Sequence, residues 1–380
     1  MSADLIILGA SARAAAFSAL RAGLIPYAID QFADCDLCDT CQAVKIENYP
    51  ADFATLLASA PSAPWIYTGG LENYPRLVAQ MAAMRPLYGN PAEVLREVRK
   101  PEVLAKRLRE AGLAVPALRT SPPVDPSEDE KWLRKPRHSS AGLGIRWHQA
   151  GGAPPGTSRS YYQKFIAGAS CSAVFVAHGG ECELLGATDQ QSGSPGLLAE
   201  PFLYAGSAGP RMLSAGETSQ LQRLGEVLTG DFDLRGLFNV DYVDDGAKIW
   251  PLEVNPRYSA SIEVLEYALG ESFLARHVAQ FGPKLPKISK GFNLETCRFA
   301  AKGIVYAPTD CRVTARMHQL RKEWNSDPLY PFVADIPREG DLIRRGHPVV
   351  TVLAKGPNLV ATKGILAERM SEVLTALSVS

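Results

Sequence analysis

One stretch of the sequence decides the fold: Phe238-Asn-Val-Asp241-Tyr-Val-Asp-Asp-Gly-Ala-Lys-Ile-Trp-Pro-Leu-Glu253-Val-Asn255-Pro-Arg257. Its centre, Asp-Asp-Gly, is typical of a tight turn between two antiparallel strands. On such strands Asp241 and Glu253 are neighbours that can face the same side. Glu253 and Asn255 stand two residues apart, so strand alternation points both side chains to one face, and Arg257 continues it.

Two carboxylates and an amide that converge in this way indicate a site for a hard cation. Mg²⁺ prefers oxygen ligands and leaves room for phosphates, and an arginine beside it can hold a carboxylate or a developing phosphoryl charge. The alternative is an acidic hairpin whose carboxylates face water. It accounts for Asp244 and Asp245, but not for an acid, an amide and an arginine set in an apolar strand. The stretch therefore predicts a phosphoryl-transfer centre.

Two lysines earlier in the chain stand where phosphates are commonly bound. Lys135 ends a predicted strand and precedes a loop of small residues from Ser139 to Gly144. Lys100 begins a predicted helix, whose dipole favours anions at that end. Taken alone, either lysine is typical of a solvated surface. The two lysines indicate a phosphate site only together with the other motif residues.

Taken in order, these residues resemble the ATP-grasp superfamily. In that family an acid is followed twelve residues later by Glu-x-Asn-x-Arg, as Asp241 is followed here by Glu253, Asn255 and Arg257. The resemblance implies ATP and Mg²⁺ as cofactors, with Mn²⁺ as a substitute metal. It implies that Asp241, Glu253 and Asn255 are metal ligands, and that Arg257 and Lys135 act on the phosphoryl group.

The resemblance also implies a nucleotide site. A helix-starting lysine followed by Gly-x-x-x-Pro matches Lys100, and the adenine hinge is similar to Gln163-Lys-Phe-Ile-Ala-Gly168. The nucleotide-binding residues that it implies are Lys100, Lys135, Ser139, Gly142, Gly144, Gln163, Lys164, Phe165 and Ile166. The sequence departs from the family in three ways. The loop has two glycines where many relatives have four, Gln163 replaces an acid, and Ser170 replaces a ribose-binding Glu, so the ribose contact is unassigned.

The start of the chain predicts a β-loop-α-β unit of a parallel sheet, from Leu5 to Asp30. Together with the resemblance, it predicts an α/β fold (an α+β grasp) in three parts. These are a Rossmann-like pre-ATP-grasp domain at residues 1–95, an ATP-grasp domain at 96–280 with a mobile lid at about 115–161, and a strand-rich C-terminal cap at 281–380.

Composition excludes several classes of protein. Lys plus Arg is 40 and Asp plus Glu is 40, so the formal net charge is zero, which argues against nucleic-acid and polybasic membrane-surface partners. Hydrophobic residues make up 46%, as in ordinary folded domains, and no apolar run approaches the length of a spanning helix. No signal-peptide pattern precedes the first strand, so we expect a cytoplasmic protein.

The seven cysteines, an odd number, predict reduced thiols. Three of them form the motif Cys35-x-x-Cys38-x-x-Cys41, whose spacing is compatible with zinc or with part of an iron-sulfur cluster. No fourth ligand is nearby, and the intervening aspartates predict a polar loop. We therefore favour small loop thiols over a metal site.

The resemblance implies a ligase. A carboxylate substrate attacks the γ-phosphate of ATP to form an acylphosphate, and an amine or similar nucleophile then displaces phosphate. Weaker motifs, among them Thr188-Asp-Gln-Gln191 and Ala334-Asp-Ile-Pro337, resemble a branch of ATP-dependent carboligases related to biotin carboxylase. That branch implies a role in the biosynthesis of the one-carbon cofactors tetrahydromethanopterin or methanofuran.

Three alternatives stay open. They are a biotin-carboxylase-like carboxylase, a non-catalytic nucleotide-binding subunit, and an NAD-dependent oxidoreductase suggested by Gly9-x-Ser11-x-Arg13. The expected partners are a small-molecule carboxylate and a nucleophile, with no nucleic acid and no membrane. A homodimer is one candidate oligomeric state, and the identity of both substrates is open.

Overall fold

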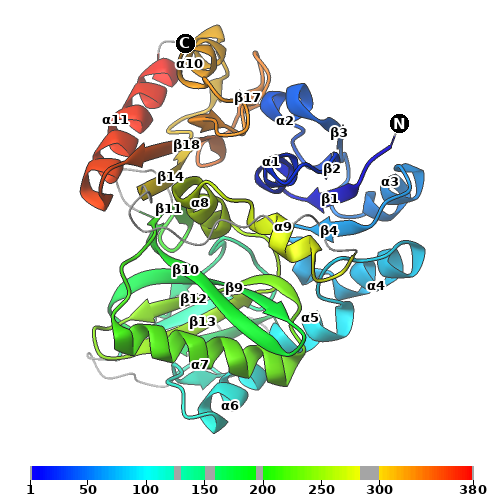
Figure 1. Ribbon diagram of the computed structural model, residues 1–380. Helices are drawn as coiled ribbons and strands as arrows, with labels where there is room; N and C mark the ends of the chain where they lie inside the picture. The colour runs from blue at the N-terminus through cyan, green and yellow to red at the C-terminus, as the bar shows by residue number, and fades with distance from the viewer. Residues whose placement is uncertain (1, 124–129, 150–158, 194–199, 283–298, 379–380) are drawn as a thin grey trace.

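The computed structural model describes residues 2–123, 130–149, 159–193, 200–282 and 299–378. It contains a four-stranded parallel sheet, an eight-stranded antiparallel sheet and two smaller sheets (Figure 1). Within these residues, no helix has the length and apolar character that crossing a membrane requires.

The N-terminal part is built on four parallel strands in the order β3-β2-β1-β4: β1 (Leu5–Gly9), β2 (Pro26–Asp30), β3 (Gln42–Lys45) and β4 (Trp65–Tyr67). All five residues of β1 are buried, as its apolar run requires. The predicted β-loop-α-β start is confirmed, with α1 at Arg13–Arg21. The other helical segments here are α2 (Cys35–Thr40), α3 (Phe53–Ser59), the 3₁₀ turn η1 (Leu71–Asn73) and α4 (Pro75–Met84).

The prediction of a polar loop around the cysteine motif is wrong, because residues 35–40 form helix α2. Asp36 is buried, and its carboxylate accepts the backbone N–H groups of Asp335 and Ile336 at 3.0 and 2.9 Å. The polar side chains of this segment predict exposure to solvent, but the Asp36 carboxylate instead binds backbone groups of a segment that is distant in sequence. Cys35, Cys38 and Cys41 are free thiols, and no metal-holding group of three His, Cys, Asp or Glu side chains occurs among the described residues. Cys297 lies outside them.

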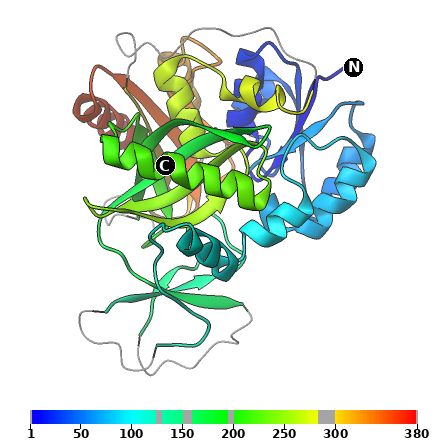
Figure 2. The same ribbon diagram turned by 60° about the horizontal axis from the view of Figure 1, so that its bottom comes forward.

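The middle of the chain begins with two helices, α5 (Ala92–Val98) and α6 (Pro101–Glu110). A small antiparallel sheet follows, with the order β5-β8-β6-β7, and projects from the body of the molecule (Figure 2). Its strands are β5 (Leu118–Arg119), β6 (Trp132–Pro136), β7 (Arg146–Trp147) and β8 (Ser160–Lys164). It occupies the predicted lid, of which residues 124–129 and 150–158 lie outside the described residues.

The large sheet has the order β13-β12-β9-β10-β11-β14-β18-β16. Its first five strands are β9 (Ala169–His178), β10 (Glu181–Ser192), β11 (Tyr204–Gly209), β12 (Gly236–Asp244) and β13 (Ile249–Asn255). Helix α7 (Ala215–Phe232) packs Leu224 and Leu228 on one face, and Ser214 caps its start, since Ser214 Oγ accepts the Glu217 N–H at 3.1 Å. Helices α8 (Ala260–Leu269) and α9 (Phe273–Val278) pack between the other face and the N-terminal part.

The C-terminal strands continue this sheet instead of forming one of their own. They are β14 (Phe299–Tyr306), β16 (Val333–Ala334) and β18 (Pro348–Gly356), while β15 (Cys311–Arg312) pairs with β17 (Leu342–Ile343). Helices α10 (Ala315–Trp324) and α11 (Leu359–Ser378) belong to the same C-terminal region. Strands from both sides of residue 280 thus belong to one sheet. The division of the chain into three domains, with one boundary near residue 280, therefore stays a proposal.

Buried charges join the two ends of the chain. The Arg13 guanidinium is paired with the carboxylates of Asp335, at 2.9 Å, and of Glu263. Lys302 Nζ lies 2.6 Å from the other oxygen of Glu263. Arg13 and Glu263 are each 1% exposed. This cluster fastens α1 to α8 and to the C-terminal region.

Asp34, next to this cluster, provides a pH-dependent prediction. Burial and the neighbouring carboxylates of Asp335 and Asp36 raise its pKa to about 8. Since the unfolded chain loses this proton near pH 4, stability falls as pH rises from about 4 to about 8. We expect Asp34→Asn to stabilise the protein by about 1–2 kcal/mol at pH 8, after allowing for partial exposure, and by less at pH 5.

Urea unfolding at the two pH values measures the effect. The exposed Glu339→Gln is the control and should show no such difference. An equal gain for Asp34→Asn at both pH values would contradict the prediction.

Candidate functional site

The β12–β13 hairpin brings together the acids predicted from the sequence. Asp241 is paired with Glu253 across the two strands, and Asn239 with Asn255, so the expected neighbourhood of the carboxylates is confirmed. Asn255 Nδ2 donates a hydrogen bond to Asp241 Oδ2 at 3.0 Å. Three of the predicted oxygen ligands therefore lie on one face of the hairpin.

The two carboxylates have different electrostatic environments. Burial, and then the charge of Glu253, raises the pKa of Asp241 to about 6. Burial also disfavours the charged form of Glu253, but the cations of Arg99, Lys135 and Arg257 outweigh it and hold the pKa of Glu253 below its usual range. The two carboxylates lie close together, and the negative charge of Asp241 is destabilised. A divalent cation bound between them would offset this destabilisation.

The donor set fits Mg²⁺, which takes carboxylate and amide oxygens. A further oxygen is present that the sequence interpretation missed: Asn239 Oδ1 is buried and has no hydrogen-bond partner among the described residues. Asn239 stands two residues before Asp241, so strand alternation could have identified it. The Asn255 amide turns its nitrogen toward Asp241, and offering its oxygen to a metal requires the amide to turn over.

Gln190 on β10 also belongs to this neighbourhood. Its Nε2 donates to Asp241 Oδ1 at 2.8 Å, and Asn239 Nδ2 donates to the same oxygen at 3.0 Å. No spacing within the hairpin identifies Gln190, because it comes from another strand of the sheet.

Lys135, at the end of β6, is directed into the site. It is 7% exposed, and its Nζ lies 3.1 Å from Gln163 Oε1. Burial disfavours its charge, but Tyr161 and the carboxylates of Glu253 and Asp241 outweigh burial and raise the pKa of Lys135. The small sheet thus supplies a charged lysine to the cleft that contains the acids.

The structure does not bring Lys100 to these residues. Its side chain is about half exposed and pairs with Glu97, with Nζ 2.6 Å from Glu97 Oε1. The preceding residue, Arg99, takes the inward position. Its guanidinium pairs with Glu253 and also donates to Asn73 Oδ1 at 3.0 Å and to the Ser139 carbonyl at 3.2 Å. Lys100 therefore stays a predicted phosphate cation that the structure does not bring to the acids, whereas its neighbour Arg99 contacts Glu253.

This difference leads to a prediction that compares adjacent residues. Arg99→Ala should weaken binding of the ATP analogue AMP-PNP with Mg²⁺ by about 10-fold or more, since charge-assisted hydrogen bonds contribute about 1.5–3 kcal/mol each. Lys100→Ala should change it by less than about threefold, because an exposed pair contributes little. Calorimetric titration measures both. A larger loss for Lys100→Ala would restore the assignment made from the sequence.

The predicted phosphate loop lies against the large sheet. The Ala141 carbonyl accepts the N–H of Tyr204 at 2.9 Å, and Ser139 is held through its carbonyl by Arg99. Gly142 has φ +79°, and a Cβ there would collide with the Phe202 carbonyl oxygen. Gly144 also has a positive φ, of +75°. Both predicted glycines are thus required by the loop conformation.

The predicted adenine hinge follows β8. Gln163 is buried against Lys135, and Phe165 packs edge-on against Trp147 with ring centroids 4.9 Å apart. The Lys164 side chain turns to Glu130, 2.7 Å away, so it offers the hinge its backbone only. The N–H of Ile166 donates no hydrogen bond within the described part of the chain. Such a free backbone donor suits a purine edge.

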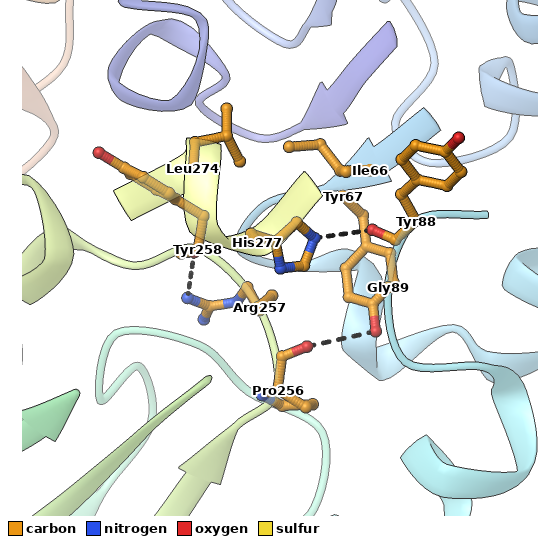
Figure 3. Close-up of a pocket in the computed structure, with 9 residues that line it drawn as sticks. All are labelled: Ile66, Tyr67, Tyr88, Gly89, Pro256, Arg257, Tyr258, Leu274 and His277. Carbon is orange, nitrogen blue, oxygen red and sulfur yellow. Dashed lines mark hydrogen bonds between the residues drawn. The ribbon is translucent and has the colours of Figure 1, made fainter. Parts of the chain in front are cut away.

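Arg257 joins the hairpin to the N-terminal part. Its Nη2 donates to Glu72 Oε1 at 2.7 Å and to Asn255 Oδ1 at 3.1 Å, and its Nη1 donates to the Tyr258 carbonyl. Figure 3 shows the Pro256 carbonyl facing the Tyr67 hydroxyl beside a cavity of about 10 Å³, room for one water. The predicted catalytic arginine is thus held rigidly at the edge of the site.

Comparisons with known proteins concern the domain family and the fold. The ATP-grasp domain family matches residues 102–261. The fold is similar to that of an L-amino acid ligase from Bacillus licheniformis (13% identity, 98% of both chains, TM-score 0.68). It is also similar to the biotin carboxylase domain dimer of Hydrogenobacter thermophilus 2-oxoglutarate carboxylase, solved with MgADP, ADP and bicarbonate (12% identity, 94% of this chain and 87% of that one, TM-score 0.63).

A longer protein shares the fold in part. Rhizobium etli pyruvate carboxylase aligns with 97% of this chain, which spans 37% of that enzyme, at 14% identity and a TM-score of 0.68. At these identities the likeness concerns the fold. No curated protein matches the sequence.

Proposed function

Because this chain carries an ATP-grasp domain at residues 102–261 and has the fold of ATP-grasp enzymes, we propose that it is an ADP-forming ligase. It uses ATP and Mg²⁺ to activate a carboxylate as an acylphosphate, which an amine or similar nucleophile then attacks. The observation that carries the proposal is that Asp241 and Glu253 are paired across β12 and β13, within reach of the charges of Lys135 and Arg257.

Each residue has a role that its position supports. Asp241, Glu253 and Asn255 would hold Mg²⁺, with Mn²⁺ as a substitute, and the metal would neutralise charge on the triphosphate. Lys135 and Arg99 hold phosphate oxygens, and the Ser139–Gly144 loop closes backbone N–H groups on them. Backbone groups from Lys164 to Ile166 bind the adenine, with Phe165 beside it.

Arg257 stabilises the charge that develops when the carboxylate oxygen bonds to the γ-phosphorus and ADP leaves. The lid, the small sheet that includes β6 and β8, excludes water from the acylphosphate, so that the nucleophile and not water displaces phosphate. Both roles follow from the position of these residues around the acid hairpin.

ADP release from ATP and Mg²⁺ in the presence of a panel of carboxylic acids and amines tests the proposal. We expect release that requires the metal, one acid and one amine together. Nucleotide binding without turnover for any pair would favour a non-catalytic nucleotide-binding subunit.

A carboxylase is the second candidate. The structure of the Hydrogenobacter thermophilus domain contains bicarbonate beside MgADP, which makes bicarbonate a reasonable acid for a chain of the same fold. ADP release that requires bicarbonate, with ¹³C appearing in the product, would favour this candidate.

An oxidoreductase is disfavoured by the N-terminus of α1. Asp30 accepts the N–H of Ala12 at 2.5 Å, and Arg13 is engaged in the buried cluster. The Ala12 N–H and the Arg13 side chain are therefore already engaged by the protein and not directed to a dinucleotide phosphate.

The finer assignments also stay proposals. The motif residue Thr188 lies on β10, and Asp335 directly follows β16. From the resemblance of these motifs we propose a place in the carboligase branch and in one-carbon cofactor biosynthesis. A cytoplasmic location and a homodimer are likewise proposed, and fractionation and light scattering would test them.

A further inference from the structure

The carboxyl ends of β1 and β4 form a natural position for a ligand. In the order β3-β2-β1-β4, the chain continues from β1 to β2 and β3 on one side of β1, and then crosses to β4 on the other side. The strand order therefore reverses between β1 and β4. Ligands of open parallel sheets bind at such a switch point. The loops that meet here are joined by a hydrogen bond from Thr68 Oγ1 to the Ser11 carbonyl, at 2.9 Å.

Glu72 lies at this switch point with one oxygen unused. It is 1% exposed, and its Oε1 accepts both Nε and Nη2 of Arg257, at 3.0 and 2.7 Å. Its Oε2 is buried and has no hydrogen-bond partner among the described residues. Burial works against the charge, but Arg257 and Arg99 outweigh it and keep the pKa of Glu72 below its usual range. A buried, ionised oxygen without a partner is costly.

A second unpaired group lies beside it. The Tyr49 hydroxyl is buried without a hydrogen-bond partner in the described part of the chain. It rests against Gly70, where a Cβ would collide with it, and the Glu72 charge acts on it. At Gly69 a Cβ would stand 3.5 Å from the Arg257 guanidinium. Two polar groups without partners among the described residues therefore lie next to Arg257, where Gly69 and Gly70 let side chains pack closely on the backbone.

We propose that Glu72 Oε2 and the Tyr49 hydroxyl bind the nitrogen of the nucleophile, a primary amine that enters at the switch point. This inference rests on the proposed ligase function. An N–H donor satisfies the free carboxylate oxygen, and the phenol can accept from or donate to the same group. Arg257 contacts both Glu72 and Asn255. The amine therefore lies on one side of the Arg257 guanidinium, and the hairpin where the acylphosphate forms lies on the other.

Two variants isolate the unused groups. Glu72→Gln retains an oxygen for Arg257 but replaces the free acceptor by a donor. Tyr49→Phe removes a hydroxyl that has no partner, so the melting temperature of the free protein should stay the same or rise. The controls are Glu97→Gln and Tyr74→Phe, of which Tyr74 packs edge-on against Tyr49 with centroids 6.2 Å apart.

The probe is ethylammonium, titrated by ligand-detected NMR into each protein in the presence of AMP-PNP and Mg²⁺. We expect saturable binding to the wild type, a loss of at least about 10-fold in Glu72→Gln and of about threefold or more in Tyr49→Phe, and no change in the controls. AMP-PNP affinity should stay within about twofold in every variant.

Two results overturn the inference: ethylammonium that binds Glu72→Gln as tightly as it binds the wild type, or no saturable binding to the wild type. Failure of the proposed ligase function gives a different result. In that case AMP-PNP does not bind the wild type, while ethylammonium binding still depends on Glu72.

Discussion

Glu253→Gln should lower Mg²⁺-dependent ADP release by at least about 100-fold while the protein stays folded. Removing a carboxylate that would hold Mg²⁺ beside the reacting phosphates costs catalysis on this scale. The side chain of Glu253 is 35% exposed and its partner Arg99 has two further acceptors, so folding does not depend on this carboxylate. A coupled assay of ADP release measures turnover, and electron paramagnetic resonance of free Mn²⁺ measures metal affinity, which should fall as well.

The matched control is Glu226→Gln, an exposed acid on α7 that pairs only loosely with Arg223, at 3.4 Å. It should leave both measurements unchanged. If folded Glu253→Gln turned over ATP at the wild-type rate, the assignment of the metal centre to this hairpin would be wrong.

Arg13→Ala should destabilise the protein by about 3–5 kcal/mol. Removing one partner of a buried ion cluster leaves the others charged and unpaired. Glu263 would retain Lys302, but Asp335 would lose the two hydrogen bonds that it accepts from Arg13. Because the cluster joins α1 to α8 and to the C-terminal region, the unfolding transition should shift as a whole. Urea denaturation measures the loss.

Arg316→Ala is the control for this experiment, because Arg316 also contacts two carboxylates, Glu323 and Glu372, but on the surface. Its replacement should leave the urea midpoint nearly unchanged, because ion pairs on the surface contribute little. A loss for Arg13→Ala as small as that of the control would mean that the buried cluster does not hold the two ends of the chain together.

Much of the fold and of the site could be predicted from local patterns. The β12–β13 hairpin and the β-loop-α-β start depend on neighbours within about thirty residues, and both are confirmed. The pairing of Asp241 with Glu253 follows from strand alternation and a turn between them. Such features are local because hydrogen bonds within a hairpin or a helix end involve residues close in sequence.

The errors have a common physical origin. Residues 35–40 were expected to be a loop because they are polar, but Asp36 is buried by segments three hundred residues away. The role of Lys100 stays a prediction, but its side chain pairs with Glu97, whereas Arg99 next to it is directed inward. Which side of a helix meets a cleft depends on what packs against it, and sequence spacing carries no such information.

The order of residues along the chain was sufficient to predict the acid hairpin and the likeness to the ATP-grasp family, because both depend on side chains within one hairpin and on their spacing along its strands. Tertiary structure alone brought Gln190 to Asp241, Arg99 to Glu253 and Glu72 to Arg257. These pairs join residues from 51 to 185 positions apart. They form because burial leaves charged and polar groups no water to contact, so that each must find a partner wherever the fold supplies one.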